Sequence, residues 1–259
     1  MKNLLSTLFM LSCMIMPPSV FAAHPLATDD AGTNGARKFQ LETSAEFGWD
    51  KQDNVKSSSQ SVGVSISAGI FDSLDVVLAA PFTWQQVKEN NSTVLDNSGL
   101  NDLTLEMKWR FLEYGPASFA IKPGIILPTA SRDKQLGNGR PGYGVTLIST
   151  VEYKPVAVHV NAGYLRQLYV SDDRSTNRED LYSLSLAGVV EVAKGILLVA
   201  AIETTTNPDK SSDVWLAAIT GGVIYSVNDA LDLDLGVKGG LTRPETDVTL
   251  LTGLTFKFP

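Results

Sequence analysis

The segment from Leu103 to Phe111 alternates strictly between apolar and polar side chains. A period of two places the two sets on opposite faces of a β-strand, so one face requires hydrocarbon and the other requires water. In a soluble sandwich the apolar face would meet a core. In a membrane barrel it would meet lipid, and the charged face would line a wet interior. The apolar set is Leu103, Leu105, Met107, Trp109 and Phe111, and the polar set is Thr104, Glu106, Lys108 and Arg110.

The same alternation recurs along most of the chain from residue 39 onward. No helical pattern of comparable length competes with it. Polar or glycine-rich connections separate the alternating segments. Pro81 falls inside one segment, where its missing N–H predicts a bulge or a local break in pairing. The twelve predicted strands are 39–49, 62–70, 74–84, 103–111, 118–127, 143–153, 156–164, 182–191, 196–204, 214–225, 231–241 and 248–258.

The connections and strand lengths favour a membrane barrel over a sandwich. Tight turns alternate with longer polar connections at 50–59, 86–99, 129–142, 171–180, 206–212 and 242–246. Short periplasmic turns and longer extracellular loops give this alternation. Strands of about 9 to 12 residues match the length that a tilted strand needs to cross a bilayer.

Aromatic residues cluster near the predicted strand ends, as interfacial girdles require. The alternative is that aromatic residues favour strands in general. The residues concerned are Phe39, Trp49, Phe71, Trp84, Phe111, Tyr143, Tyr153, Tyr182, Tyr225, Phe256 and Phe258.

A sheet in lipid must close, because an open edge would leave backbone groups unpaired at several kcal/mol each. The first and last strands are therefore expected to pair, with both termini on the periplasmic side. The predicted fold is all-β: a single closed antiparallel transmembrane β-barrel of about 12 strands, with short periplasmic turns and longer extracellular loops. Its lumen is narrower than that of a porin and could be partly filled by side chains.

The N-terminus predicts export. Residues 1–23 have the charged start, apolar stretch and small-residue cleavage site of a secretory signal peptide, and a lipoprotein signal at Cys13 is the weaker alternative. Residues 24–38 are predicted to be an extended lead-in, and residues 39–259 the barrel. Without the signal the charge is 20 − 28 = −8, and no cysteine remains. This composition excludes disulfides and thiol chemistry and argues against nucleic-acid binding.

Several short motifs, most of them at turns, are distributed over nearly the whole chain after residue 24. They are Pro25-Leu26-Ala27-Thr28-Asp29-Asp30-Ala31-Gly32-Thr33, Lys38-Phe39-Gln40-Leu41-Glu42, Gly69-Ile70-Phe71-Asp72-Ser73-Leu74-Asp75-Val76, Ala80-Pro81-Phe82, Lys122-Pro123-Gly124, Leu127-Pro128-Thr129 and the stretch from Tyr225 to Gly236. These motifs resemble those of a family of bacterial barrels described as transporters of a MetA pathway of phenol degradation. The resemblance implies an outer-membrane channel or uptake protein, with aromatic or other small hydrophobic compounds as candidate solutes. The chain departs from such barrels at Pro259, which follows the final aromatic residue that the outer-membrane assembly machinery reads.

The inward-facing positions of the predicted strands carry charges of both signs. One hypothesis is a polar path whose charges determine which solutes pass. The alternative is a static ion-paired plug that keeps a narrow barrel rigid. The lumen-lining candidates are Glu42, Glu46, Asp102, Glu106, Lys108, Arg110, Lys122, Glu152, His159, Glu203, Lys238 and Lys257.

Two further features invite a function. His159 suggests a barrel lipid hydrolase, which would need a serine within hydrogen-bond reach. Ser149 on the preceding strand is predicted to face the other way, so we favour a histidine without a catalytic role. Asp29 and Asp30 could enter the periplasmic mouth as a plug or gate, but a flexible acidic leader is the favoured interpretation.

The sequence therefore predicts a passive channel or uptake transporter in the bacterial outer membrane, in contact with lipid, a small-molecule solute and the assembly machinery. We expect no enzymatic activity, cofactor or metal, since two scattered histidines do not make a metal site. The alternatives are the lipid hydrolase that depends on His159, and a structural or adhesin-like barrel that binds a partner through its extracellular loops. The loop at 86–99 is the longest candidate for such binding.

Overall fold

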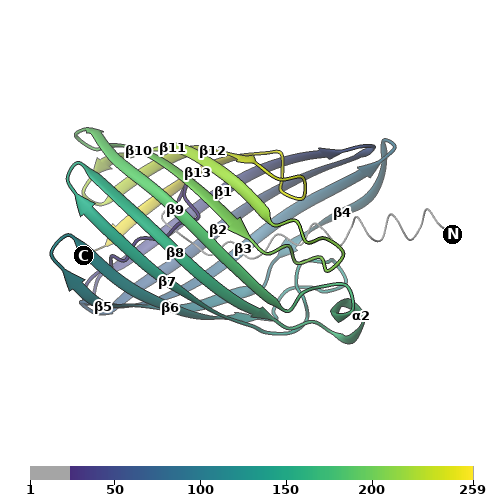
Figure 1. Ribbon diagram of the computed structural model, residues 1–259, viewed down its shortest axis with the longest axis horizontal. Helices are drawn as coiled ribbons and strands as arrows, with labels where there is room; N and C mark the ends of the chain where they lie inside the picture. The colour runs from purple at the N-terminus through teal and green to yellow at the C-terminus, as the bar shows by residue number, and fades with distance from the viewer. Residues whose placement is uncertain (1–23, 259) are drawn as a thin grey trace.

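The computed structural model describes residues 24–258, and the predicted signal peptide lies outside this range. Thirteen antiparallel strands form one sheet that curves into a barrel (Figure 1). The strands are β1 (Phe39–Gln52), β2 (Val55–Phe71), β3 (Leu74–Glu89), β4 (Ser92–Leu100), β5 (Leu103–Tyr114), β6 (Ala117–Leu127), β7 (Gly142–Tyr153), β8 (Val156–Gln167), β9 (Asp180–Ala193), β10 (Ile196–Thr205), β11 (Leu216–Asn228), β12 (Leu231–Gly240) and β13 (Val248–Phe258).

Twelve of these strands close the ring. β1 pairs with β13 from Phe39↔Phe258 to Trp49↔Val248, and β2 pairs with both β1 and β3. The first and last strands of the chain are thus hydrogen-bonded, and the predicted closed antiparallel barrel is confirmed. Closure leaves no unpaired edge at the level where lipid would surround the wall.

The thirteenth strand, β4, corrects the sequence prediction. Residues 86–99 were expected to form a long polar loop, but they extend β3 and turn back as β4, which pairs with β3 alone. Asn90 and Asn91 have φ of 50° and 64°, as the two central residues of a type I′ hairpin turn do. The residues around 50–59 likewise lengthen β1 and β2. Both hairpins rise above the wall, so water meets both faces and the apolar–polar alternation that reveals strands is lost.

Pro81 lies where β3 changes its neighbour. β3 pairs with β5 as far as Ala79 and with β4 from Phe82 onward. A proline N cannot donate to a ladder, so the residue is tolerated where pairing changes partner. The predicted local break in pairing is therefore confirmed on this side of the strand.

Five tight turns lie at one end of the barrel, and the longer connections lie at the other end together with the raised β1–β2 and β3–β4 hairpins (Figure 1). Two residues join β2 to β3, β5 to β6, β7 to β8, β9 to β10 and β11 to β12. The connection from β8 to β9 holds a single short helix, α2 (Ser171–Arg174). In the part of the chain that the structure describes, no helix is long and apolar enough to cross a membrane.

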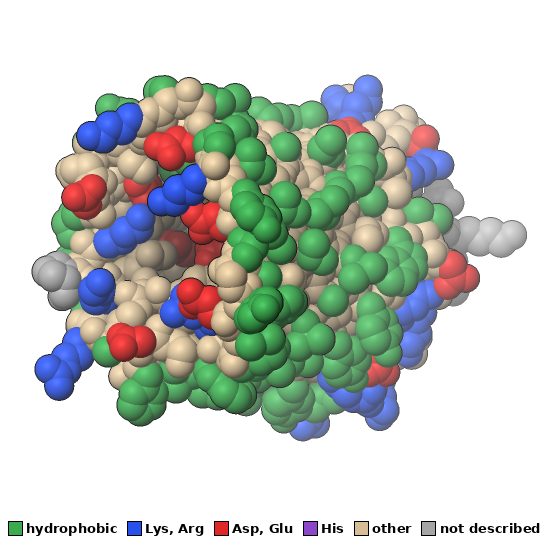
Figure 2. Space-filling model, turned by 60° about the vertical axis from the view of Figure 1, so that its left-hand side comes forward, with side chains coloured by type: hydrophobic (Ala, Val, Ile, Leu, Met, Phe, Trp, Pro, Cys, Tyr) green, Lys and Arg blue, Asp and Glu red, His purple; other side chains and the backbone are tan. Residues whose placement is uncertain are grey.

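The outer wall is apolar and the inner wall is polar. On β5, Leu105 and Met107 are 41% and 43% exposed, whereas Glu106 and Lys108 between them are 7% and 9% exposed. Figure 2 shows apolar side chains covering the wall and charged side chains at both ends. Large apolar side chains turned outward all round a closed barrel require lipid rather than water. The protein is thus built as an outer-membrane barrel.

Candidate functional site

The N-terminal segment, residues 24–38, lies inside the barrel (purple in Figure 1). Leu26 packs in an apolar cluster with Ala187, Val199 and Ala201 of β9 and β10. Ala31, which is fully buried, packs with two residues of β6 and β7. One segment therefore packs against four strands of the inner wall, β6, β7, β9 and β10.

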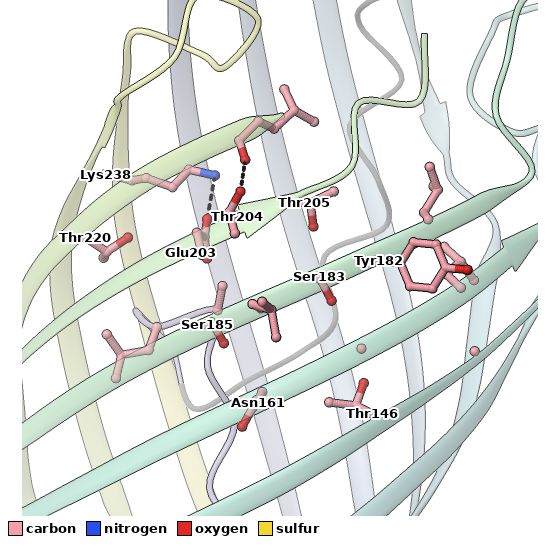
Figure 3. Close-up of a pocket in the computed structure, with 18 of the residues that line it drawn as sticks. Thr146, Asn161, Tyr182, Ser183, Ser185, Glu203, Thr204, Thr205, Thr220 and Lys238 are labelled. Atoms are coloured by element: carbon pink, nitrogen blue, oxygen red, sulfur yellow. Dashed lines mark hydrogen bonds and ion pairs between the residues drawn. The ribbon is translucent and has the colours of Figure 1, made fainter. Parts of the chain in front are cut away.

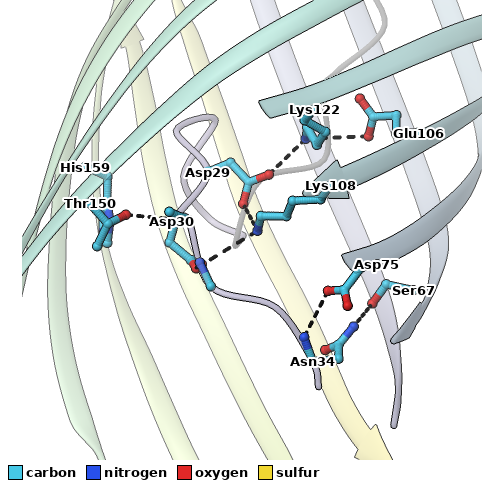
Figure 4. A network of polar contacts seen from close by, with 12 residues as sticks. Asp29, Asp30, Asn34, Ser67, Asp75, Glu106, Lys108, Lys122, Thr150 and His159 are labelled. Atoms are coloured by element: carbon cyan, nitrogen blue, oxygen red, sulfur yellow. Dashed lines mark hydrogen bonds and ion pairs between the residues drawn. The ribbon is translucent and has the colours of Figure 1, made fainter. Parts of the chain in front are cut away.

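Hydrogen bonds fasten the segment on its way from the periplasmic end. The N–H of Arg37 donates to Gly69 O at 2.7 Å, and the Asn34 N–H donates to Asp75 Oδ2 at 2.9 Å. Deeper in the lumen, the Ala31 N–H donates to Thr150 Oγ1 at 2.9 Å. Figure 4 shows the contacts of the segment with Asp75 and Thr150.

Asp29 carries the strongest electrostatic contact of the segment. Its two carboxylate oxygens each lie 2.9 Å from a lysine ammonium, Lys108 of β5 and Lys122 of β6. Lys122 also lies 3.5 Å from Glu106, and Lys108 lies 4.0 Å from Asp30 (Figure 4). We call Asp29, Glu106, Lys108 and Lys122 the Asp29 cluster. Burial of the Asp29 carboxyl acts to raise its pKa, but the two lysines outweigh burial and lower the pKa to about 2.

This arrangement corrects the sequence interpretation of residues 24–38. A flexible acidic leader was favoured, yet Asp29 is only 5% exposed and bridges two strands of the wall. The other interpretation of Asp29 and Asp30, a plug inside the barrel, agrees with the observed position of the segment. A signal was present: the inner faces of β5 and β6 carry Lys108, Arg110 and Lys122 against Glu106 alone, and a buried excess of positive charge requires an acid from elsewhere.

A cavity of about 300 Å³ lies beside the segment within the lumen. We call it the upper cavity, because its lining runs from the segment at His24 and Leu26 to the extracellular loop at Asn207. Figure 3 shows Glu203 of β10 pointing toward Lys238 of β12. The Lys238 ammonium lies 3.6 Å from Glu203 and 3.7 Å from Glu245.

The twelve lumen-lining candidates fall into four groups. Glu42, Glu46, Glu106, Lys122, Glu203 and Lys238 line the upper cavity. Lys108 is buried and pairs with Asp29 of the N-terminal segment. His159 is buried and contacts Thr150, which binds the segment. Asp102 accepts the N–H groups of Ala130 and Asn138 and so holds the loop between β6 and β7. Arg110, Glu152 and Lys257 lie close to the periplasmic turns, Glu152 and Lys257 being exposed there.

Comparison of the sequence with models of known protein families shows to which family the chain belongs. The model of the family described as "Putative MetA-pathway of phenol degradation" matches residues 28–258. The chain belongs to this family. The resemblance seen in the short sequence motifs is thereby confirmed, and it extends over almost all of the described residues.

Solved structures similar to this family member are outer-membrane barrels. The COG4313 outer membrane channel from Pseudomonas putida F1 superposes with a TM-score of 0.71 at 16% identity, covering 88% of this chain and 98% of that one. The NanC porin has a TM-score of 0.58 at 9% identity, over 85% of this chain and 100% of that one. The KdgM porin has a TM-score of 0.51 at 10% identity, over 85% and 99%. No curated protein matches the chain. These likenesses show the fold.

His159 of this family member contacts Thr150, a residue that also binds the N-terminal segment. Its Nδ1 lies 2.9 Å from Thr150 Oγ1, the same hydroxyl that accepts the Ala31 N–H. Ser149 pairs across the ladder with Val160, whose side chain is exposed on the outer wall. The serine therefore faces away from His159, as predicted. No group of three or more metal-ligating side chains gathers among residues 24–258.

The extracellular loops of the barrel are fastened to one another, which the sequence did not indicate. Arg178, between β8 and β9, donates to the carbonyl oxygens of Asn207, Asp209 and Ser212 in the loop between β10 and β11, at 2.7 to 2.9 Å. A guanidinium is well suited to this role because it presents several donors in a fixed plane. The wall of the extracellular mouth above the upper cavity is therefore ordered.

Proposed function

We propose that this protein is a passive outer-membrane channel for small molecules, gated by its N-terminal segment. The observation that carries the proposal is a closed barrel whose polar lumen holds a cavity and, next to it, a segment held by hydrogen bonds and by the Asp29 cluster. A solute would enter between the extracellular loops, occupy the upper cavity, and continue when the segment moves aside.

The polar wall suits solutes that can hydrogen-bond. Thr146, Asn161 and Thr220 present hydroxyl or amide groups beside the charged residues of the upper cavity (Figure 3). The description of the family concerns phenol degradation, which supports small aromatic compounds that carry a hydroxyl group as solutes. Since the lumen is narrow, selection by size and by wall charge is expected.

The test is reconstitution in planar lipid bilayers, with the wild-type protein beside the variant Asp29→Asn. The variant removes the carboxylate that joins Lys108 and Lys122 to the segment, so we expect more frequent or longer openings. The rate of liposome swelling in phenol, measured against protein-free liposomes of the same lipid, then reports how much an aromatic solute passes through the protein. Bilayers that stay silent with both proteins contradict a channel, and equal gating by both contradicts the role of the segment.

A further inference from the structure

We infer that the upper cavity binds a small organic cation that carries a hydrogen-bond acceptor. This inference rests on the proposed channel function and narrows it: among charged solutes, the protein admits cations in preference to anions. Three observations support it, namely the charge balance of the cavity, the position of Lys238 between two of its carboxylates, and a buried amide N–H donor without a partner.

The cavity wall is strongly acidic. The Lys122 ammonium that reaches it is already paired with Asp29 and Glu106. The other charged side chains of the wall are Glu42, Glu46, Glu203, Glu245 and Lys238. Four carboxylates therefore face one ammonium. In a space partly shielded from water, this excess attracts cations and repels anions more strongly than the same charges would on an open surface.

Lys238 shows how an ammonium fits between these carboxylates. Its Nζ lies 3.6 Å from a Glu203 oxygen and 3.7 Å from a Glu245 oxygen, longer than a direct hydrogen bond. The two acids thus hold a positive charge without being saturated by it. A second ammonium group from a solute would find acceptor oxygens still available on the same wall.

Asn207 supplies a donor at the extracellular side of the cavity. The residue is 2% exposed, and its Oδ1 accepts the N–H of Asp209 at 2.9 Å. Its Nδ2 has no hydrogen-bond partner among the described residues, although Asn207 lines the cavity. A buried donor without an acceptor is unfavourable, because it has lost its hydrogen bond to water and gained none in return. A solute oxygen would satisfy it, and His24 Nε2, also unpartnered, lies at the other end of the wall.

A ligand known from a barrel of similar fold does not suit the acidic wall of the upper cavity. The KdgM porin is known in complex with oligogalacturonate, whose sugar units are carboxylates. A carboxylate solute would face repulsion from Glu42, Glu46, Glu203 and Glu245 in the upper cavity here. A similar fold therefore does not imply the same class of solute. The side chains that line the lumen determine that class.

The experiment measures ion preference and block in planar bilayers, with ethanolamine hydrochloride as the organic cation. In a KCl gradient, the reversal potential of the wild-type channel is expected to lie between zero and the equilibrium potential of potassium, as it does for a channel that prefers cations. Ethanolamine should reduce the KCl conductance at lower concentration than ethylamine, because only ethanolamine offers an oxygen to Asn207. In Glu203→Gln/Glu245→Gln, the half-blocking concentration should rise roughly tenfold, equal to about 1.4 kcal/mol of binding.

Two further variants keep the test decisive. Glu113→Gln/Glu191→Gln removes two exposed acids near the periplasmic turns, and its block should match wild type. Lys238→Gln removes the resident ammonium, so its block should strengthen, an effect opposite to that of the glutamate variant. Chloride preference, or block unchanged in both cavity variants, overturns the cation inference and leaves the channel intact. Silent bilayers overturn the channel function and the inference with it.

Discussion

At the scale of single residues, the Asp29 cluster decides what the N-terminal segment does. Lys122 is 2% exposed and makes ionic contacts with Asp29 at 2.9 Å and Glu106 at 3.5 Å. A buried charge is tolerated when its partners are in place, and removing one member leaves the others uncompensated. The complete Asp29 cluster therefore adds little to the stability of the protein, but losing one of its members lowers the stability strongly.

The substitution Lys122→Gln tests this dependence. It leaves the carboxylates of Asp29 and Glu106 with less compensation, so the free energy of unfolding should fall by about 3–5 kcal/mol. Urea unfolding in phospholipid vesicles measures the change. The matched control is Lys257→Gln, because the Lys257 side chain is 48% exposed and its pair with Asp232 should be worth about 1 kcal/mol or less. Equal losses in both variants would contradict the argument.

The pKa of Asp29 predicts how pH acts on the segment. Because the folded-state pKa is lowered from 3.8 to about 2, the ionised carboxylate stabilises the docked segment fully above pH 3.8. That contribution is lost as pH falls from 3.8 through about 2. Open probability in bilayers should therefore stay constant from pH 7 to 5 and rise below about pH 3. Asp29→Asn should lack the rise, and a midpoint near pH 5 to 6 would point to a different group.

At the scale of elements, the strand β5 separates lipid from lumen by alternation alone. Leu105 and Met107 face outward, while Glu106 and Lys108 face the N-terminal segment. A one-residue shift in register would exchange the two sets, so the pattern specifies the register strongly. The same reasoning holds for β8, where Val158 and Val160 are exposed and His159 between them is buried.

A charge on the outer face of β5 should be costly. In Leu105→Lys the ammonium would face hydrocarbon, so the free energy of unfolding should fall by about 2–4 kcal/mol. Val94→Lys is the matched control, since Val94 is also 41% exposed but lies on β4, which pairs only with the extension of β3. Unfolding in vesicles compares the two. A loss for Val94→Lys as large as that for Leu105→Lys would contradict the assignment of the lipid-facing belt.

The strands also show how much of the fold could be predicted from the sequence. Alternation predicted the twelve wall strands, because one face of each strand meets lipid and the other meets water. The need to pair backbone groups in lipid predicted the closure of β1 on β13, and the missing N–H of Pro81 predicted a local break in pairing. Alternation missed β4 and the upper parts of β1 and β2, where both faces meet water. It also missed the place of Asp29, because the lysines that bind it lie about 80 and 93 residues further along the chain.

At the scale of the whole molecule, the segment of residues 24–38 and the barrel are one functional unit. The wall supplies the membrane-facing surface and the charged lumen, and the segment fills part of that lumen. Leu26 packs on β9 and β10, Ala31 packs on β6 and β7, and Asp29 is held by β5 and β6. If passage requires the segment to move, then tethering it should close the channel without altering the barrel.

A disulfide provides such a tether. Ala31 and Ala120 of β6 are both buried and belong to one packed cluster, and the only natural cysteine, Cys13, precedes the described residues. Oxidation of Ala31→Cys/Ala120→Cys should therefore join the segment to the wall and bring bilayer conductance close to baseline, and reduction should restore it. Each single-cysteine variant should be unaffected by oxidant. If mass spectrometry shows complete cross-linking and conductance persists, solutes pass beside the segment, and the barrel is a channel with a fixed constriction rather than a moving gate.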